Sequence, residues 1–356
     1  MERMDILSLP LDVLEAHMAE MGEPKFRAKQ IFNWLHQKQV TEFAQMTTLS
    51  LQLRERLDRI FCINRLNIAR RLASSIDDTV KYLYELPDGN FVETVLMDYH
   101  HGKSLCISTQ VGCRMGCQFC ASTIAGYVRD LTPAELLLQI YETQRDAGCR
   151  IDSLVLMGIG EPLDNFENVI QFFRLLSDPN GFGMSLRHVT LSTCGLVPRI
   201  RALAEMKLGV TLSVSLHSPD NGRRSEIMPV NRRYSVEELL DACRYYFEKT
   251  GRRVTMEYAV IDGVNSTKAD AKRLAERLRG MQCHVNLIPV NPIAERDFRS
   301  MRQTVERFQK ELTALGIHAT IRRTLGSDIQ AACGQLRRDA DGRKNARGIS
   351  DGGGRN

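Results

Sequence analysis

From about residue 103 onward, short apolar runs alternate with amphipathic helical segments, and this alternation constrains the fold more than any other feature. The runs are rich in Val, Ile, Leu and Thr, and such alternation is typical of βα units with parallel strands. About six units are too few for a closed eight-stranded barrel, so we predict an α/β fold with an open, partial (β/α)6 barrel and ligands at the carboxyl ends of its strands. The candidate strands are 103–109, 152–158, 187–193, 210–217, 253–261, 284–290 and 318–323.

The flanking regions have a different character. Residues 1–60 carry two apolar stripes at helical spacing, which predict a small helical domain that could bind RNA. Residues 61–102 shift towards a period of two around the turn at 87–90, and predict a β-hairpin linker. The barrel domain is then expected at 103–336, and the polar, glycine-rich tail at 337–356 is expected to be disordered.

Two helix starts carry a strong local signal. Thr132 is followed by Glu135, and Ser235 by Glu238, which is the spacing of a capping box. Pro133 also stands at the first helical position of the earlier helix. We therefore expect helices to begin directly after Thr132 and Ser235.

Cys113, Cys117 and Cys120 follow the first barrel strand in a C-x3-C-x2-C pattern. Iron–sulfur clusters are held by Cys thiolates, normally one for each iron. Three ligands on a 4Fe-4S cluster leave one iron open for S-adenosylmethionine, which an electron from the cluster can cleave to a deoxyadenosyl radical. Spacing and loop position favour this chemistry, with Phe119 packing on the adenine of that ligand. The alternative is a zinc site completed by Cys106 or a histidine.

Composition indicates the compartment and the broad class. With 43% hydrophobic and 26% charged residues among 356, the chain is typical of a globular protein. It has no apolar run of about 18 residues and no signal peptide, so we expect a cytoplasmic protein without a membrane partner. Its ten cysteines then favour metal binding or catalysis over a disulfide framework. The net charge of +5 is compatible with a nucleic-acid partner but does not require one.

Five further motifs occur in order along the chain. They are GIGEPLDN (158–165), TLSTCGLVP (190–198), SVSLHSP (213–219), VNLIPVNP (285–292) and DIQAACGQL (328–336). Together with the cysteine motif, they resemble the radical S-adenosylmethionine superfamily, and within it the RlmN/Cfr family of RNA adenine methyltransferases. The resemblance covers nearly the whole chain. It implies one 4Fe-4S cluster held by Cys113, Cys117 and Cys120, with S-adenosyl-L-methionine as the other cofactor.

The same motifs indicate where S-adenosylmethionine would bind. Glycines at 158–160 let the backbone approach a ligand, and Glu161 can accept hydrogen bonds from an ammonium group. The alternative for Glu161 is to cap the following helix. Several other motif residues fall at the carboxyl ends of strands and would line one mouth. By resemblance, the cosubstrate is held by Gly160, Glu161, Ser192, Ser215, Leu216, His217 and Asn291.

The resemblance also gives roles to Cys333, Cys106 and Glu93. Carbon 2 of adenine is not nucleophilic, which makes direct displacement on S-adenosylmethionine unpromising. In the family, Cys333 is first methylated as a thiolate, and a radical from a second cosubstrate then removes hydrogen from that methyl group. The methylene radical adds to adenine. Cys106 removes the ring proton or releases the product through a transient disulfide, and Glu93 matches a proton acceptor. Without the resemblance, both cysteines would be core residues and Glu93 solvent-facing.

The family divides into an RlmN type that methylates carbon 2 and a Cfr type that methylates carbon 8. The motifs GEPL and LIPVNP resemble the RlmN type, whereas Gln330 stands where an acidic residue is expected. The RlmN type implies 23S rRNA and adenosine 37 of tRNAs as substrates, an electron donor such as flavodoxin or ferredoxin, and a monomer. Carbon-8 methylation and a zinc-stabilised RNA-binding protein remain the alternatives.

Overall fold

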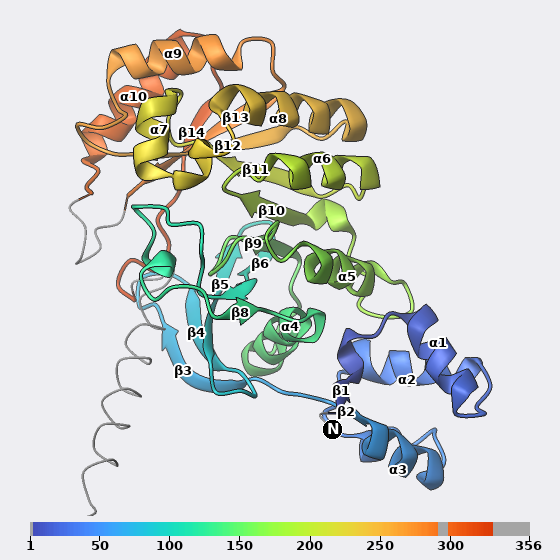
Figure 1. The fold of residues 1–356 in the computed structure, drawn as a ribbon. Coiled ribbons are helices and arrows are strands. Elements are labelled where there is room, and N and C mark those ends of the chain that lie inside the picture. The colour runs from blue at the N-terminus through green and yellow to red at the C-terminus, as the bar shows by residue number, and fades with distance from the viewer. Residues whose placement is uncertain (1–2, 291–297, 330–356) are drawn as a thin grey trace, which may run out of the picture.

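The structure, a computed structural model, describes residues 3–290 and 298–329, and its central feature is a ten-stranded sheet (Figure 1). The strand order is β14-β13-β12-β11-β10-β9-β6-β5-β4-β3. The strands are β3 (Asn67–Ala73), β4 (Val80–Glu85), β5 (Phe91–Tyr99), β6 (Gly102–Cys106), β9 (Ser153–Leu156), β10 (Val189–Thr193), β11 (Thr211–Ser215), β12 (Val254–Val260), β13 (Cys283–Pro289) and β14 (Ala319–Ile321).

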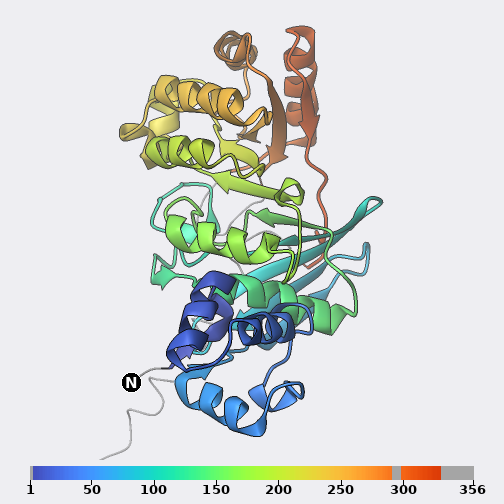
Figure 2. The ribbon, with the colours of Figure 1, turned by 90° about the vertical axis from the view of Figure 1, so that its right-hand side faces the viewer.

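Neighbouring strands from β6 to β14 are all parallel, and helices occupy the connections between them. The helices are α4 (Pro133–Ala147), α5 (Phe166–Ser177), α6 (Val197–Met206), α7 (Asn221–Ile227), α8 (Val236–Thr250), α9 (Lys268–Leu278) and α10 (Arg302–Ala314). Helices α4, α5, α6 and α8 stack along one side of the sheet (Figure 1, Figure 2). The predicted α/β fold with a partial (β/α)6 barrel is confirmed.

Local sequence signals fix the start of two barrel helices. The Thr132 hydroxyl accepts a hydrogen bond from the Glu135 backbone N–H at 3.2 Å, and the Glu135 carboxylate accepts one from the Thr132 N–H at 2.9 Å. Ser235 and Glu238 cap α8 in the same reciprocal way. Gly251 ends α8 with φ at 66°, a conformation that other residues rarely adopt. Both predicted capping boxes are confirmed.

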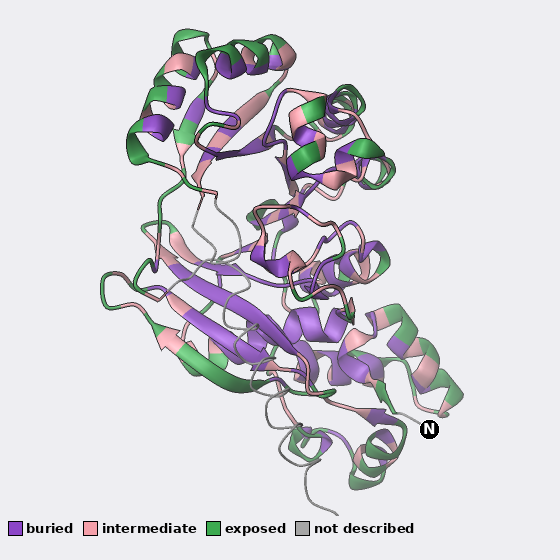
Figure 3. Ribbon diagram, turned by 60° about the vertical axis from the view of Figure 1, so that its left-hand side comes forward, coloured by how far each residue is buried: buried purple, intermediate pink, exposed green. Residues whose placement is uncertain are grey.

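Residues 61–102 extend the barrel sheet. β4 and β5 pair antiparallel across the predicted turn, and β5 then pairs antiparallel with β6, the first barrel strand. β4 also pairs with β3, which the sequence did not indicate. Six of the seven β3 residues are exposed (Figure 3), so no alternation of apolar and polar residues marks this edge strand. The hairpin that was predicted as a linker is therefore part of the barrel sheet itself.

The first sixty residues are mainly helical, as predicted. They contain α1 (Leu11–Glu20), α2 (Phe26–His36) and α3 (Leu51–Ile60), closed by a short parallel pair of β1 (Met4–Asp5) with β2 (Phe61–Cys62). This helical group lies beside α4 and α5 (Figure 1, Figure 2). Buried His36 contacts the Tyr141 hydroxyl of α4 at 2.9 Å. Gly181 makes room for Phe32, because a Cβ there would lie 2.8 Å from its ring.

The antiparallel strands have two different faces. One face packs on α4, where Tyr84 contacts Thr143 and Thr94 donates to Gln139, both at 2.8 Å. The opposite face is also buried (Figure 3) and carries charged side chains described below. No helix in residues 3–290 or 298–329 is long and apolar enough to cross a membrane. The tail predicted at 337–356 lies outside the described residues.

Candidate active site

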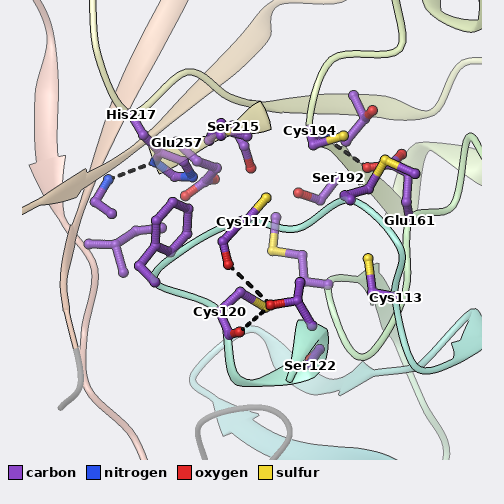
Figure 4. Close-up of a pocket in the computed structure, with 18 of the residues that line it drawn as sticks. Cys113, Cys117, Cys120, Ser122, Glu161, Ser192, Cys194, Ser215, His217 and Glu257 are labelled. Atoms are coloured by element: carbon purple, nitrogen blue, oxygen red, sulfur yellow. Dashed lines mark hydrogen bonds between the residues drawn. The ribbon is translucent and has the colours of Figure 1, made fainter. Parts of the chain in front are cut away.

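A cavity of about 290 Å³ opens at the carboxyl ends of the parallel strands (Figure 4). Parallel strands all end at the same edge of a sheet, so residues far apart in the sequence converge there. The lining comes from the loop after β6, the turn after β9 and the ends of β10 to β13. The predicted site residues in this lining are Cys113, Cys117, Cys120, Gly160, Glu161, Ser192, Ser215 and His217.

The remaining predicted residues are placed differently. The Leu216 side chain is fully buried in the main hydrophobic core, and Leu216 is not part of the cavity lining. Cys106 and Glu93 belong to a neighbouring buried cluster on the antiparallel strands. Asn291 and Cys333 lie outside the described residues.

The cysteine loop is held at both of its ends. β7 (Gln110–Val111) pairs antiparallel with β8 (Arg129–Asp130) and closes the loop at its base. Inside the loop, the Thr123 hydroxyl donates to the carbonyls of Cys117 at 3.2 Å and Cys120 at 2.9 Å. The Gln118 N–H donates to the Ile227 carbonyl at the end of α7 at 2.8 Å. The loop therefore rests on α7 while its cysteines line the cavity.

The chemistry of the donor set fits a 4Fe-4S cluster. Burial raises the pKa of the Cys113 thiol to about 12 and raises the pKa of Cys117 as well, so iron binding must supply the energy of deprotonation. In the described part of the chain, no three His, Cys, Asp or Glu side chains converge on one metal-ion position. Spread thiolates suit a cluster, with one ligand for each iron, better than a single zinc ion. The buried Ser122 hydroxyl makes no hydrogen bond within the described residues and lines the same cavity.

Glu161 fastens the turn after β9 to the end of β10. One carboxylate oxygen accepts from the Leu163 N–H at 3.0 Å, and the other accepts from the Cys194 N–H at 2.7 Å. Burial raises the pKa of Glu161, although these hydrogen bonds favour the charged form. The Thr193 and Cys194 side chains also hydrogen-bond to this carboxylate, which lines the cavity. The alternative that Glu161 caps α5 is wrong, because α5 begins at Phe166 and Glu161 bonds elsewhere.

Gly160 is required by this turn. Its φ is 109°, and a Cβ would lie 2.7 Å from the backbone nitrogen of Gln110. Gln110 in turn accepts a hydrogen bond from the Glu161 N–H at 2.8 Å through its side-chain oxygen. The glycine thus allows close packing that holds Glu161 at the cavity wall.

His217 lies across the cavity from this turn (Figure 4). Its Nδ1 accepts a hydrogen bond from the Ala259 N–H at 2.9 Å, which leaves the proton on Nε2. Burial and the nearby Arg224 charge lower the pKa of His217 to about 3, so the ring is neutral. Phe119 meets His217 edge to face with centroids 4.7 Å apart. Two aromatic rings therefore adjoin the third cysteine, and the packing of Phe119 on the adenine of the cosubstrate stays a prediction.

Two cavity residues were missed by sequence reasoning. Glu257 lies on β12, is 4% exposed and accepts hydrogen bonds from Ser213 at 2.7 Å and Asn286 at 2.9 Å. The sequence feature that could have indicated Glu257 is that it is the one charged residue in this strand. Cys194, for which the sequence suggested no role, lines the cavity beside Cys117.

A second buried polar cluster lies on the inner face of the antiparallel strands. Glu93 forms an ion pair with Lys81 at 2.9 Å, and the two side chains are 2% and 0% exposed. Cys106 on β6 stands opposite Val95, two residues beyond Glu93, so Glu93 and Cys106 point to the same face. The alternative of a solvent-facing Glu93 is wrong. Met157 packs on the Cys106 cluster and also lines the cavity, so the two sites adjoin.

The chain after β14 returns to this face. Leu325 packs on the cluster that contains Cys106. The Asp328 carboxylate accepts hydrogen bonds from the Ser75 N–H and the Ser74 hydroxyl, both at 2.7 Å. The described chain ends at Ile329, four residues before Cys333 in the sequence. The contacts between Asp328 and Ser75 hold this end next to the antiparallel strands.

Comparisons with known proteins agree with this fold and site. The Radical SAM superfamily model matches residues 107–278, and the ribosomal RNA large subunit methyltransferase N-terminal domain model matches residues 4–63. A crystal structure of a radical SAM methyltransferase from Sphaerobacter thermophilus has a TM-score of 0.89 and 42% identity, and covers 93% of this chain and 98% of that chain. The partial barrel with three cysteines at its mouth, together with these similarities, defines a radical SAM methyltransferase.

Curated relatives identify the family more closely. "Probable dual-specificity RNA methyltransferase RlmN" of Lachnoclostridium phytofermentans is 52% identical over 341 residues, which is 95% of each chain. The protein of the same description from Clostridioides difficile is 48% identical over 328 residues, covering 92% of this chain and 95% of its own. The chain belongs to the RlmN family of radical SAM RNA methyltransferases. As a member it uses a 4Fe-4S cluster and S-adenosylmethionine.

Proposed function

We propose that the protein methylates carbon 2 of an adenine in the peptidyl transferase region of 23S rRNA, and of adenosine 37 in tRNAs. The observation that carries this proposal is the junction of two buried sites through Met157. One site has the thiols for a cluster, and the other has the thiol and carboxylate that proton transfer needs.

Different cavity residues are proposed to bind the cluster and the cosubstrate. Cys113, Cys117 and Cys120 hold the cluster, whose reduced form supplies the electron that cleaves S-adenosylmethionine. Glu161 accepts hydrogen bonds from the ammonium group of the cosubstrate, because it lines the cavity and an ionised carboxylate acts only as an acceptor. The other residues proposed to hold the cosubstrate are Gly160, Ser192, Ser215, Leu216, His217 and Asn291.

The antiparallel face handles the RNA base. Cys333 carries the methyl group, and Glu93 or Cys106 takes the ring proton. Once the adduct radical has lost the ring proton and one electron, Cys106 attacks the Cys333 sulfur as a thiolate. The bond from that sulfur to the transferred carbon breaks, the carbon takes up a proton and becomes the methyl group, and a dithiol reductant reopens the disulfide. Support comes from the shared orientation of Glu93 and Cys106, and from the contact of Asp328, five residues before Cys333 in the sequence, with Ser75.

The RNA is proposed to reach this site by extrusion of the target base. The helical group at 1–60 and exposed arginines of the edge strand, Arg70 among them, would contact phosphates and recognise folded RNA by shape. We also propose that the protein works as a cytoplasmic monomer and takes its electron from flavodoxin or ferredoxin.

Mass spectrometry of nucleosides tests the reaction. The reconstituted protein is incubated anaerobically with a reductant, methyl-deuterated S-adenosylmethionine and unmodified 23S rRNA fragment or tRNA. We expect labelled 2-methyladenosine, which disappears in Cys333→Ala and persists in a control, Cys149→Ala, at a half-buried position outside the cavity lining. Labelled 8-methyladenosine would assign the carbon-8 reaction instead. An intact cluster without any labelled nucleoside would contradict the proposed substrates.

A further inference from the structure

Arg224 on α7 carries a buried positive charge with an unusual set of partners. The residue is 0% exposed. Its Nε donates to the Leu216 carbonyl at 3.0 Å, and Nη1 donates to the Asn231 side-chain oxygen at 2.9 Å. Nη2 donates to the carbonyls of Cys194 at 2.8 Å and Ser215 at 3.0 Å. All of these acceptors are neutral, and within residues 3–290 and 298–329 no carboxylate forms an ion pair with Arg224.

The preceding residue shows the usual arrangement. Arg223 lies on the same helix, its side chain is 43% exposed, and it forms an ion pair with Asp270 at 2.7 Å. An ionised group that is buried without a counter-charge is costly, even when all of its hydrogen bonds are made. Arg224 therefore needs a negative charge close by, and the described protein residues do not provide one within ion-pair distance.

The cysteine cavity lies next to Arg224. Cys194, whose carbonyl accepts from Arg224, lines the cavity and packs with Cys117, and both face the same space in Figure 4. The loop that carries Cys117 hydrogen-bonds to Ile227, the last residue of the Arg224 helix. Met228, the next residue, also lines the cavity.

We propose that Arg224 is the buried counter-cation of the 4Fe-4S cluster and raises its reduction potential. This inference rests on the proposed function, because it takes Cys113, Cys117 and Cys120 as the ligands. Three thiolates give the oxidised cluster a net negative charge. One electron from a low-potential reductant adds another negative charge without making or breaking a bond. A fixed cation behind the cavity stabilises the more negative state, and cluster potentials depend on local charge and burial.

Arg224 acts as a positioning residue because it touches neither the substrate nor the reacting atoms. Its guanidinium group also donates hydrogen bonds to the carbonyls at the ends of β10 and β11. A loss of activity in an Arg224 variant would therefore not distinguish a lost charge from disorder of those strand ends. The reduction potential separates the electrostatic role of Arg224 from its structural role. In a protein that retains its cluster, the potential responds to the charge of Arg224.

The experiment is a redox titration of the reconstituted full-length protein without S-adenosylmethionine, after iron and sulfide have been measured. Arg224→Met is expected to disfavour reduction at least tenfold, a shift of about 59 mV to more negative potential. Arg224→Lys keeps the charge and is expected to retain most of the wild-type potential. The matched control, Arg223→Gln, removes an arginine that already has a carboxylate partner and is expected to leave the potential unchanged.

A second variant addresses the case in which Arg224→Met does not fold. Asn231→Asp places a carboxylate at the Nη1 contact and neutralises Arg224 in place, with almost no change in volume. It is expected to shift the potential in the same direction as Arg224→Met. Equal potentials in wild type and in the variant that folds, at equal cluster content, would overturn the role of Arg224. Normal iron content in Cys117→Ala would instead overturn the ligand assignment on which the inference rests.

Discussion

The parallel and antiparallel halves of the sheet present functional side chains in different ways. In the parallel half, the site is built where strands end, from residues such as Ser192, Ser215 and His217. In the antiparallel half, Lys81 and Glu93 lie within their strands, on a buried face. Strand ends can therefore change without disturbing the sheet, whereas the face residues contribute to folding and to chemistry together.

The largest effect is expected at the cluster ligands of the parallel half. Cys117→Ala should lose most of the bound iron and all measurable methylation, because no other described residue replaces that thiolate at its position. Far-ultraviolet circular dichroism should remain unchanged, since the residue lies in a loop. The control is Cys283→Ser, at the amino end of β13 and outside the cavity lining. Unfolding of Cys117→Ala would show that the strand-end site is not separable from the fold.

The next effect is expected at the antiparallel face. Lys81→Met removes the cation at 2.9 Å from the buried Glu93 carboxylate and should lower the free energy of unfolding by about 3–5 kcal/mol. The double variant Lys81→Met, Glu93→Leu should recover much of this loss, because neither position then carries a buried charge. Urea denaturation measures both variants. The exposed pair of Arg174 with Asp12 is the control, and Arg174→Met should cost about 1 kcal/mol or less.

Two buried histidines contribute to the pH dependence of stability, His36 at the end of α2 in the helical group and His217 after β11 in the parallel half. His36 packs on α4 behind the antiparallel half, and burial lowers its pKa to about 3, as it does for His217 at the parallel rim. Below pH 6.5 the unfolded chain binds a proton that the folded chain excludes, so stability falls as the pH falls towards 3. Between pH 7 and pH 5, His36 should account for about 2 kcal/mol of this loss.

His36→Asn tests that contribution by urea denaturation at both pH values. The difference in unfolding free energy between wild type and variant should shrink at pH 5. A difference that stays constant with pH would contradict the assignment, and would leave the remaining pH dependence to other groups.

The smallest effects are expected at the helix caps, one for each half. Thr132 caps α4, which covers the antiparallel strands, and Ser235 caps α8 beside the parallel strands. Thr132→Ala and Ser235→Ala should each lower the free energy of unfolding by about 1 kcal/mol, because one backbone N–H loses its partner. Thermal denaturation of the two variants compares them directly. Clearly unequal losses would indicate that the halves do not unfold as one unit.

The sequence predicted the parallel half better than the antiparallel half. Seven strands and both capping boxes were predicted because their signals are local. The edge strand β3 was missed because its residues are exposed on both faces. The buried ion pair of Lys81 with Glu93 was missed because each charged residue alone indicates a solvent-facing position.

The site residues divide along the same line. The cysteine loop and Glu161 were found from motifs whose spacing is local. Glu257 and Arg224 were not, because their partners come from separate strands and helices that meet only in the folded chain. Burial of a polar side chain is a tertiary property, and one sequence does not display it.

The hydrogen bonds between Asp328 and residues 74–75 have a consequence for biosynthesis. Translation completes every described strand and the three cysteines proposed as cluster ligands before it reaches Asp328, and Cys333 follows later still. A polypeptide whose synthesis stops shortly after β14 would contain the strands that form the cofactor cavity. It would lack both Cys333 and the hydrogen bonds of Asp328 with Ser74 and Ser75. Such a chain would lack the residue proposed to deliver the methyl group.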